Sequence, residues 1–108
     1  MAQAIQINEF GGPEVMQLVQ TPDRQPGAGE VLISHTAIGV NFIDTYHRSG
    51  LYPLEMPAGL GLEAAGAVTA VGPGVAGVVI GDRVAYASQP PGAYASAVSY
   101  THLRAHET

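Results

Sequence analysis

Glycine and proline are spread so densely through this sequence that no long helix fits between them. The 108 residues include 14 glycines and eight prolines. Both residue types interrupt helices and favour turns. The apolar residues between them fall in short runs, which is typical of a β-rich domain with many tight turns. A chain of this length forms one small domain with a core of modest size.

The apolar runs predict short strands separated by turns. Ile5 and Ile7 alternate with polar residues, which is the period of a half-buried strand. The predicted strands cover residues 5–7, 15–20, 30–40, 63–71, 83–87 and 93–98. This arrangement predicts a barrel or a sandwich. The sequence has no strand–helix alternation and no GxGxxG motif opening a helix, so it lacks the usual dinucleotide-binding fold.

Residues 41–49 depart from the strand pattern and predict one short helix. Asn41 is a residue type that caps helix N-termini, and Asp44 would lie in the first turn, where a carboxylate is favourable. Gly50 is a natural C-terminal stop. Arg48 lies four residues after Asp44, and we expect a weak surface ion pair between them.

The charge balance excludes two classes of partner. Nine carboxylates face four arginines, lysine is absent and the net charge is -5. The sequence therefore has no basic patch for nucleic-acid phosphates or for an anionic membrane surface. The uncharged residues 64–81 reach the length of a membrane span, but five glycines and Pro73 favour strand–turn–strand instead. The N-terminus has no signal-peptide pattern, so we expect a cytoplasmic protein.

Metal binding is not expected. With no cysteine, disulfides and thiolate-bound zinc are ruled out. His102 and His106 have a spacing that zinc ligands on a helix can have, but a third ligand and the HExxH pattern are missing.

Several segments in a fixed order resemble a known enzyme family. They are GGPEV at residues 11–15, AIGVNFIDTYHRSG at 37–50, LYPLEMPAGLGLEAAGAVTAVGPGV directly after it, and then GDRVAYA and GAYA. Together, over residues 2–97, they are similar to the N-terminal catalytic domain of the medium-chain dehydrogenase/reductase superfamily. Within it the chain resembles the zinc-independent, NADPH-dependent quinone oxidoreductases related to zeta-crystallin.

The resemblance implies a mainly β, GroES-like, partly open β-barrel with one short helix over residues 1–98. A Rossmann domain, absent from this chain, would follow in the full enzyme. The zinc alcohol dehydrogenases of the same superfamily place a cysteine ligand at the position of Asn41 and a histidine ligand at that of Leu62. Leucine cannot bind zinc, so the resemblance implies a reductase that works without metal.

The resemblance also implies three site residues. Asn41 matches a residue that contacts the nicotinamide side of NADPH, whereas Tyr46 and Tyr52 match tyrosines that line the quinone pocket and are the candidate catalytic residues. Hydride transfer to a quinone carbon leaves negative charge on a quinone oxygen, to which an amide or phenol can donate a hydrogen bond. The structural alternatives are a helix cap for Asn41, core packing for Tyr46 and an exposed loop position for Tyr52.

Other polar residues near these positions are interpreted as structural. Asp44 is assigned to the helix start, and Glu63 is expected to be buried and paired with an arginine. Gly61 and Gly66 are expected to allow close approach of backbone segments.

Residues 99–108, SYTHLRAHET, do not resemble the family and are expected to be a non-native tail. The alternative is a genuine short protein that frays at its end. We expect this chain to be inactive alone, and the full-length protein to be a homodimer that reduces quinones or similar small electrophiles. The alternative functions are an enoyl or alkenal reductase and a non-catalytic binding or assembly module.

Overall fold

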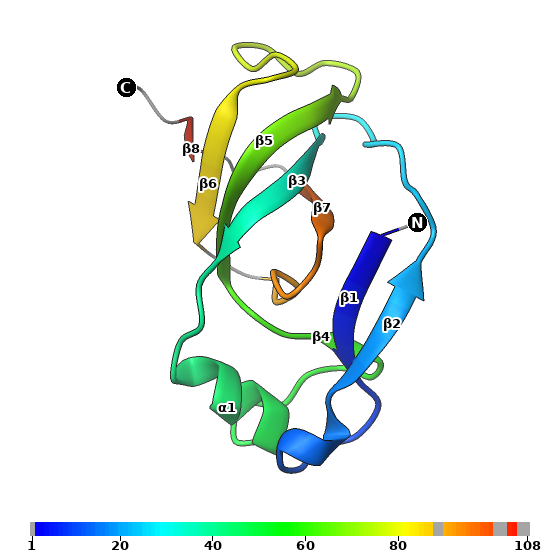
Figure 1. Ribbon diagram of the computed structural model, residues 1–108, viewed down its shortest axis with the longest axis vertical. Helices are drawn as coiled ribbons and strands as arrows, with labels where there is room; N and C mark the ends of the chain where they lie inside the picture. The colour runs from blue at the N-terminus through cyan, green and yellow to red at the C-terminus, as the bar shows by residue number, and fades with distance from the viewer. Residues whose placement is uncertain (1, 88–89, 101–103, 106–108) are drawn as a thin grey trace.

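A computed structural model describes residues 2–87, 90–100 and 104–105. These residues form two antiparallel sheets and one α-helix (Figure 1). The first sheet has the order β2-β1-β4 and the second β7-β3-β5-β6-β8. The strands are β1 Ala2–Ile7, β2 Gln17–Thr21, β3 Val31–Ile38, β4 Ala58–Gly59, β5 Glu63–Val71, β6 Arg83–Ala87, β7 Ala97–Tyr100 and β8 Arg104–Ala105. The helix is α1 Ile43–Ser49, and a 3-10 turn, η1, covers Pro13–Val15.

The mainly β architecture with one short helix is confirmed. The two sheets approach each other at an isolated bridge between Ala4 and Ala95. Over the described ranges they are not closed into one continuous barrel, which agrees with the expected open form. Helix α1 lies at one end of the molecule, beside the turn that joins β1 and β2 (Figure 1).

Strand boundaries differ from the predictions where pairing between distant segments decides them. The two residues of β4 pair with the end of β1, and they lie outside every strand predicted from the sequence. The last predicted strand, 93–98, was wrong at both ends, because β7 runs over Ala97–Tyr100 and pairs with β3. Residues 93–96 instead form a connection that donates to backbone carbonyls of Leu60 and Gln3.

The core consists of two apolar clusters, one for each sheet. The larger one packs Ile33 and Val68, on β3 and β5, against Val84 on β6. Tyr100 belongs to it and stacks on Tyr86 with the ring centroids 4.3 Å apart. The smaller cluster consists of Ile7, Ala58 and Leu60.

Ser99 and Tyr100, the first residues of the predicted tail, belong to β7 and so lie in a strand. The non-native origin of the tail stays a prediction.

Uncharged residues 64–81 form most of β5 and the turns after it. No helix within the described residues is long and apolar enough to cross a membrane.

Glycines permit close backbone contacts at two predicted positions. A Cβ on Gly66 would meet the Ser34 carbonyl oxygen of the neighbouring strand. Gly61 has a φ of 94°, and a Cβ on it would lie 3.1 Å from the Tyr94 backbone nitrogen, besides meeting the Tyr94 ring. Both predictions of close approach are confirmed.

His35 connects two distant segments through both ring nitrogens. Nδ1 lies 2.7 Å from the Ala95 carbonyl oxygen and Nε2 lies 3.1 Å from the Tyr86 hydroxyl. A neutral ring with its proton on Nδ1 satisfies both contacts, since Nδ1 donates to the carbonyl and Nε2 accepts from the hydroxyl. Burial lowers the pKa of His35 from its ordinary value of 6.5, against a smaller opposing effect of the Ala95 hydrogen bond.

This shift predicts a loss of stability on mild acidification. The unfolded chain takes up the His35 proton at a higher pH than the folded chain does. The His35 contribution is therefore complete above pH 6.5 and decreases as the pH falls below that value. Urea unfolding at pH 7.5 and at pH 5.5 measures the change, with His35→Gln as the non-titrating control. An equal loss in both proteins would assign the pH dependence to other groups.

Candidate functional site

The site is built around the entry to α1. Asn41 does not cap the helix through its side chain, so that part of the prediction was wrong. Instead, the Asn41 backbone N–H donates to Asp44 Oδ2 at 3.0 Å, and the Asp44 N–H donates to the Asn41 carbonyl at 3.0 Å. Gly50 ends the helix as predicted, with a φ of 92° and its N–H donating to the Tyr46 carbonyl.

Asp44 is one of two buried polar residues on this short helix. Its side chain is 4% exposed. Besides the Asn41 N–H, its Oδ2 atom accepts a hydrogen bond of 2.5 Å from the Tyr94 hydroxyl. Its Oδ1 atom is buried without a hydrogen-bond partner among the described residues. Burial, together with the hydrogen bond and charge of Asp44, raises the pKa of Tyr94 above its usual range.

Neither of the two predicted ion pairs is formed among the described residues. Arg48 does not pair with Asp44, but its Nε donates to the Gly11 carbonyl at 3.1 Å, which ties the helix to the β1–β2 turn. Glu63 was expected to be buried, but it is only half-buried, and its side chain packs against Gly39. The Asp44 pairing was unavailable because that carboxylate points into the protein.

The two candidate tyrosines lie together, next to an aromatic residue at the helix start. The rings of Tyr46 and Tyr52 meet edge to face, 5.5 Å apart, and Phe42 contacts Tyr46 in the same way at 5.4 Å. Tyr46 is half-buried, whereas Tyr52 is 49% and Phe42 74% exposed. The arrangement leaves aromatic surface open to solvent, which suits contact with a flat ring.

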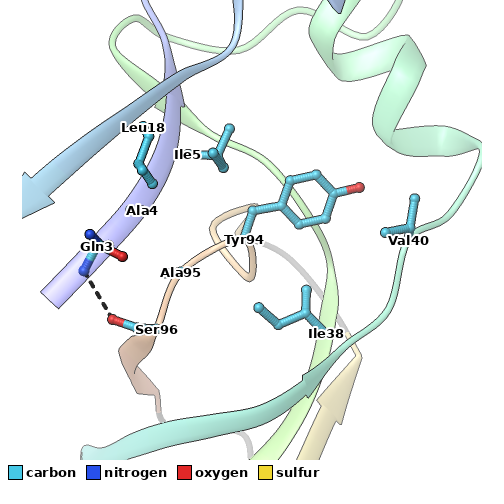
Figure 2. Close-up of a pocket in the computed structure, with 9 residues that line it drawn as sticks. All are labelled: Gln3, Ala4, Ile5, Leu18, Ile38, Val40, Tyr94, Ala95 and Ser96. Atoms are coloured by element: carbon cyan, nitrogen blue, oxygen red, sulfur yellow. Dashed lines mark hydrogen bonds between the residues drawn. The ribbon is translucent and has the colours of Figure 1, made fainter.

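An apolar groove of about 370 Å³ runs between β1 and the end of β3 (Figure 2). Its main lining side chains are Ile5, Leu18, Ile38, Val40 and Tyr94. Figure 2 shows the Tyr94 ring between Ile5 and Val40, with its hydroxyl pointing away from β1. Asn41 directly follows Val40 and shares the Asp44 oxygen with Tyr94, so it lies at the edge of this groove.

Sequence reasoning missed Tyr94. It belongs to the GAYA segment, which had been assigned to a strand, and nothing local marks its hydroxyl as important. Its role depends on Asp44, 50 positions away, and that pairing exists only in the folded chain.

The described part of the chain contains no group of three or more metal-ligating side chains. Leu62, at the position of the histidine ligand of the zinc enzymes, directly precedes β5 in the chain and is half-buried.

Known proteins are similar to this chain in fold and in sequence. The family model of the alcohol dehydrogenase GroES-like domain matches residues 27–104. The chain belongs to this family. The GroES-like domain is 51% identical to a quinone oxidoreductase of Salmonella typhimurium over 102 residues, which cover 94% of the chain and 31% of that relative.

Two further comparisons bear on the chemistry. A 2-haloacrylate reductase of Burkholderia is 45% identical over 98 residues, which cover 87% of the chain and 29% of the relative. The structure of Escherichia coli quinone oxidoreductase in complex with NADPH aligns with a TM-score of 0.88 and 48% identity, over 92% of this chain and 31% of that one. The GroES-like domain thus spans about a third of the length of the curated relatives it matches.

Proposed function

We propose that this GroES-like domain is part of a zinc-independent reductase that transfers hydride from NADPH to quinones. Tyr46 and Tyr52 bind the quinone ring, and Asn41 contacts the nicotinamide. The observation that carries the proposal is the partly exposed, edge-to-face pair of Tyr46 and Tyr52, of which Tyr46 lies on the helix that directly follows Asn41. The 51% sequence identity to a quinone oxidoreductase supports the proposal.

The Asn41 side chain is suited to contact a nicotinamide. It is half-buried, and no described residue hydrogen-bonds its side-chain amide. The amide therefore has both a donor and an acceptor available for a carboxamide group. Bound NADPH would supply the hydride. Because this chain has no glycine-rich dinucleotide motif, we assign the other cofactor contacts to a Rossmann domain outside it, and the GroES-like domain to residues 1–98.

The zinc-independent part of the proposal rests on the sequence. Leu62 has no ligand atom, and the chain has no cysteine. The Tyr46 and Tyr52 hydroxyls are instead the groups that would donate to the negative oxygen left by hydride transfer. A cytoplasmic, homodimeric full-length protein remains part of the proposal.

The second candidate function is reduction of an electron-poor carbon–carbon double bond. The 45% identity to a 2-haloacrylate reductase favours it. The same GroES-like domain serves both chemistries among the relatives, so substrate choice depends on particular side chains rather than on the fold.

A chimera separates the two candidates. Residues 1–98 replace the matching part of the E. coli quinone oxidoreductase, and NADPH oxidation is measured with 2-methyl-1,4-naphthoquinone and with 2-chloroacrylate. We expect turnover with the quinone and none from the 108-residue chain alone. Preference for 2-chloroacrylate would favour the second candidate, and a folded but inactive chimera would favour the binding module.

The quinone contact can also be tested in the chain itself. The protein has five tyrosines and no tryptophan, so quenching of tyrosine emission reports binding of the naphthoquinone. We expect Tyr52→Ala to raise the dissociation constant roughly threefold to tenfold, the loss of one aromatic contact. The matched control is Leu51→Ala, which removes a 62% exposed neighbour that has no aromatic ring. Equal weakening by both variants would contradict the assignment of Tyr52.

A further inference from the structure

We propose that Asp44 is a positioning residue that fixes Asn41 at the edge of the apolar groove, and that Tyr94 locks it in place. This inference rests on the proposed function, in which Asn41 contacts the nicotinamide. It assigns no chemical step to Asp44. Its role is to hold the Asn41 backbone, and with it the direction in which the side-chain amide points.

One oxygen atom joins two parts of the site. Asp44 Oδ2 accepts from the Asn41 N–H at 3.0 Å and from the Tyr94 hydroxyl at 2.5 Å. Tyr94 in turn supplies one wall of the groove (Figure 2). A change in the position of Tyr94 would therefore reach Asn41 through a single side chain. Hydrogen bonds to an ionised acceptor are among the stronger ones in proteins, so the connection is stiff.

The other Asp44 oxygen shows that the arrangement does more than start a helix. Oδ1 is buried and lacks a hydrogen-bond partner among the described residues, a state that lowers stability. An aspartate that is only partly buried can make the same local bond without leaving an oxygen buried and unpartnered. Half-buried Asp82 does so, accepting the Val79 N–H at 3.0 Å. Asp44 differs from Asp82 in that the same oxygen atom also accepts a hydrogen bond from Tyr94, 50 positions along the chain.

The first test needs no ligand. In the ¹⁵N-labelled 108-residue chain, the amide resonances of Asn41 report its position. We expect Tyr94→Phe to shift both the backbone and the side-chain amide signals of Asn41, because it removes only the hydroxyl that fixes Asp44. Asp44→Asn should shift them further, and the backbone amide proton should exchange with solvent at least about tenfold faster.

The matched control is Asp82→Asn, which removes the same kind of bond to a backbone N–H three residues earlier. It should leave the Asn41 signals unchanged. Tyr94→Phe keeps the test decisive if Asp44→Asn does not fold. Asn41 signals in Tyr94→Phe that match those of Asp82→Asn would overturn the proposal.

The second test is titration with NADPH of the chimera described above, which carries the Rossmann domain that this chain lacks, and it is followed at the side-chain amide of Asn41. We expect the apparent dissociation constant to increase about tenfold in Tyr94→Phe, as misplacement of a contact group predicts, and to stay constant in Asp82→Asn. An unchanged constant in Tyr94→Phe would overturn the proposal. If the unsubstituted chimera shows no NADPH-dependent shift at Asn41, the nicotinamide assignment fails, while the ligand-free signals still decide whether Asp44 positions Asn41.

Discussion

Gly66→Ala should destabilise the protein by about 3 kcal/mol, the upper end of the usual cost of an extra methyl group in a tight core. Gly66 pairs with His35 at the centre of the β3–β5 ladder. A Cβ at this position would meet the Ser34 carbonyl oxygen and lie 2.9 Å from the His35 Cα. Both obstacles are backbone atoms, so relief requires separation of the two strands rather than rotation of a side chain. Urea unfolding of the purified chain measures the loss.

The control for this prediction is Gly12→Ala. Gly12 has a φ of -80°, and the three atoms nearest to its added Cβ all belong to the carboxylate of exposed Glu14, which can move away. We expect its free energy of unfolding to stay within about 0.5 kcal/mol of the original. Similar losses in both variants would show that the β3–β5 contact is looser than the structure indicates.

Gly61→Ala should destabilise the protein by a similar amount, and it should also disturb the site. Gly61 has a φ of 94°, where a residue with a Cβ is strained by about 1–2 kcal/mol. The new Cβ would in addition lie 2.5 Å from Cδ1 and 2.8 Å from Cε1 of the Tyr94 ring. The ring must move, and its hydrogen bond to Asp44 should be lost. We expect a total loss of about 3 kcal/mol.

Gly74→Ala is the control that separates the effect of backbone strain from the effect of the collision with the Tyr94 ring. Gly74 has a φ of 80°, and its Cβ would meet no atom within 4 Å. It should therefore lose about 1–2 kcal/mol from strain alone. Only Gly61→Ala should also lower the pKa of the Tyr94 phenol toward its ordinary value, which ultraviolet titration of the five tyrosines detects. Identical titration curves in the two variants would mean that Tyr94 keeps its position.

Much of the fold could be predicted because its signals are local. Alternation of apolar and polar residues located β1, and the dense glycines and prolines placed the turns. The predicted ranges 63–71 and 83–87 coincide with β5 and β6. Gly50 ended the helix as expected, since its left-handed φ requires only the residue itself.

The candidate site was predicted only in part. The resemblance named Asn41, Tyr46 and Tyr52, and the structure brings the two tyrosines into contact. Their roles toward NADPH and quinone stay predictions. The capping role of Asn41 and the ion pair of Asp44 were wrong because they were inferred from residue type and from helix spacing, which are local signals. Asp44 makes its decisive contact with Tyr94, which the helix pattern does not include.

By itself, the sequence determined that this chain forms short strands around one short helix, because turn residues and alternation act within a few positions. It also determined that no thiolate-bound metal site exists, since the chain has no cysteine. Only the tertiary structure decided which carboxylate is buried and where strands β4 and β7 begin and end. It also decided that the Tyr94 hydroxyl reaches Asp44 on α1. Those features depend on atoms brought together from positions far apart in the chain, where packing and hydrogen bonding outweigh local preference.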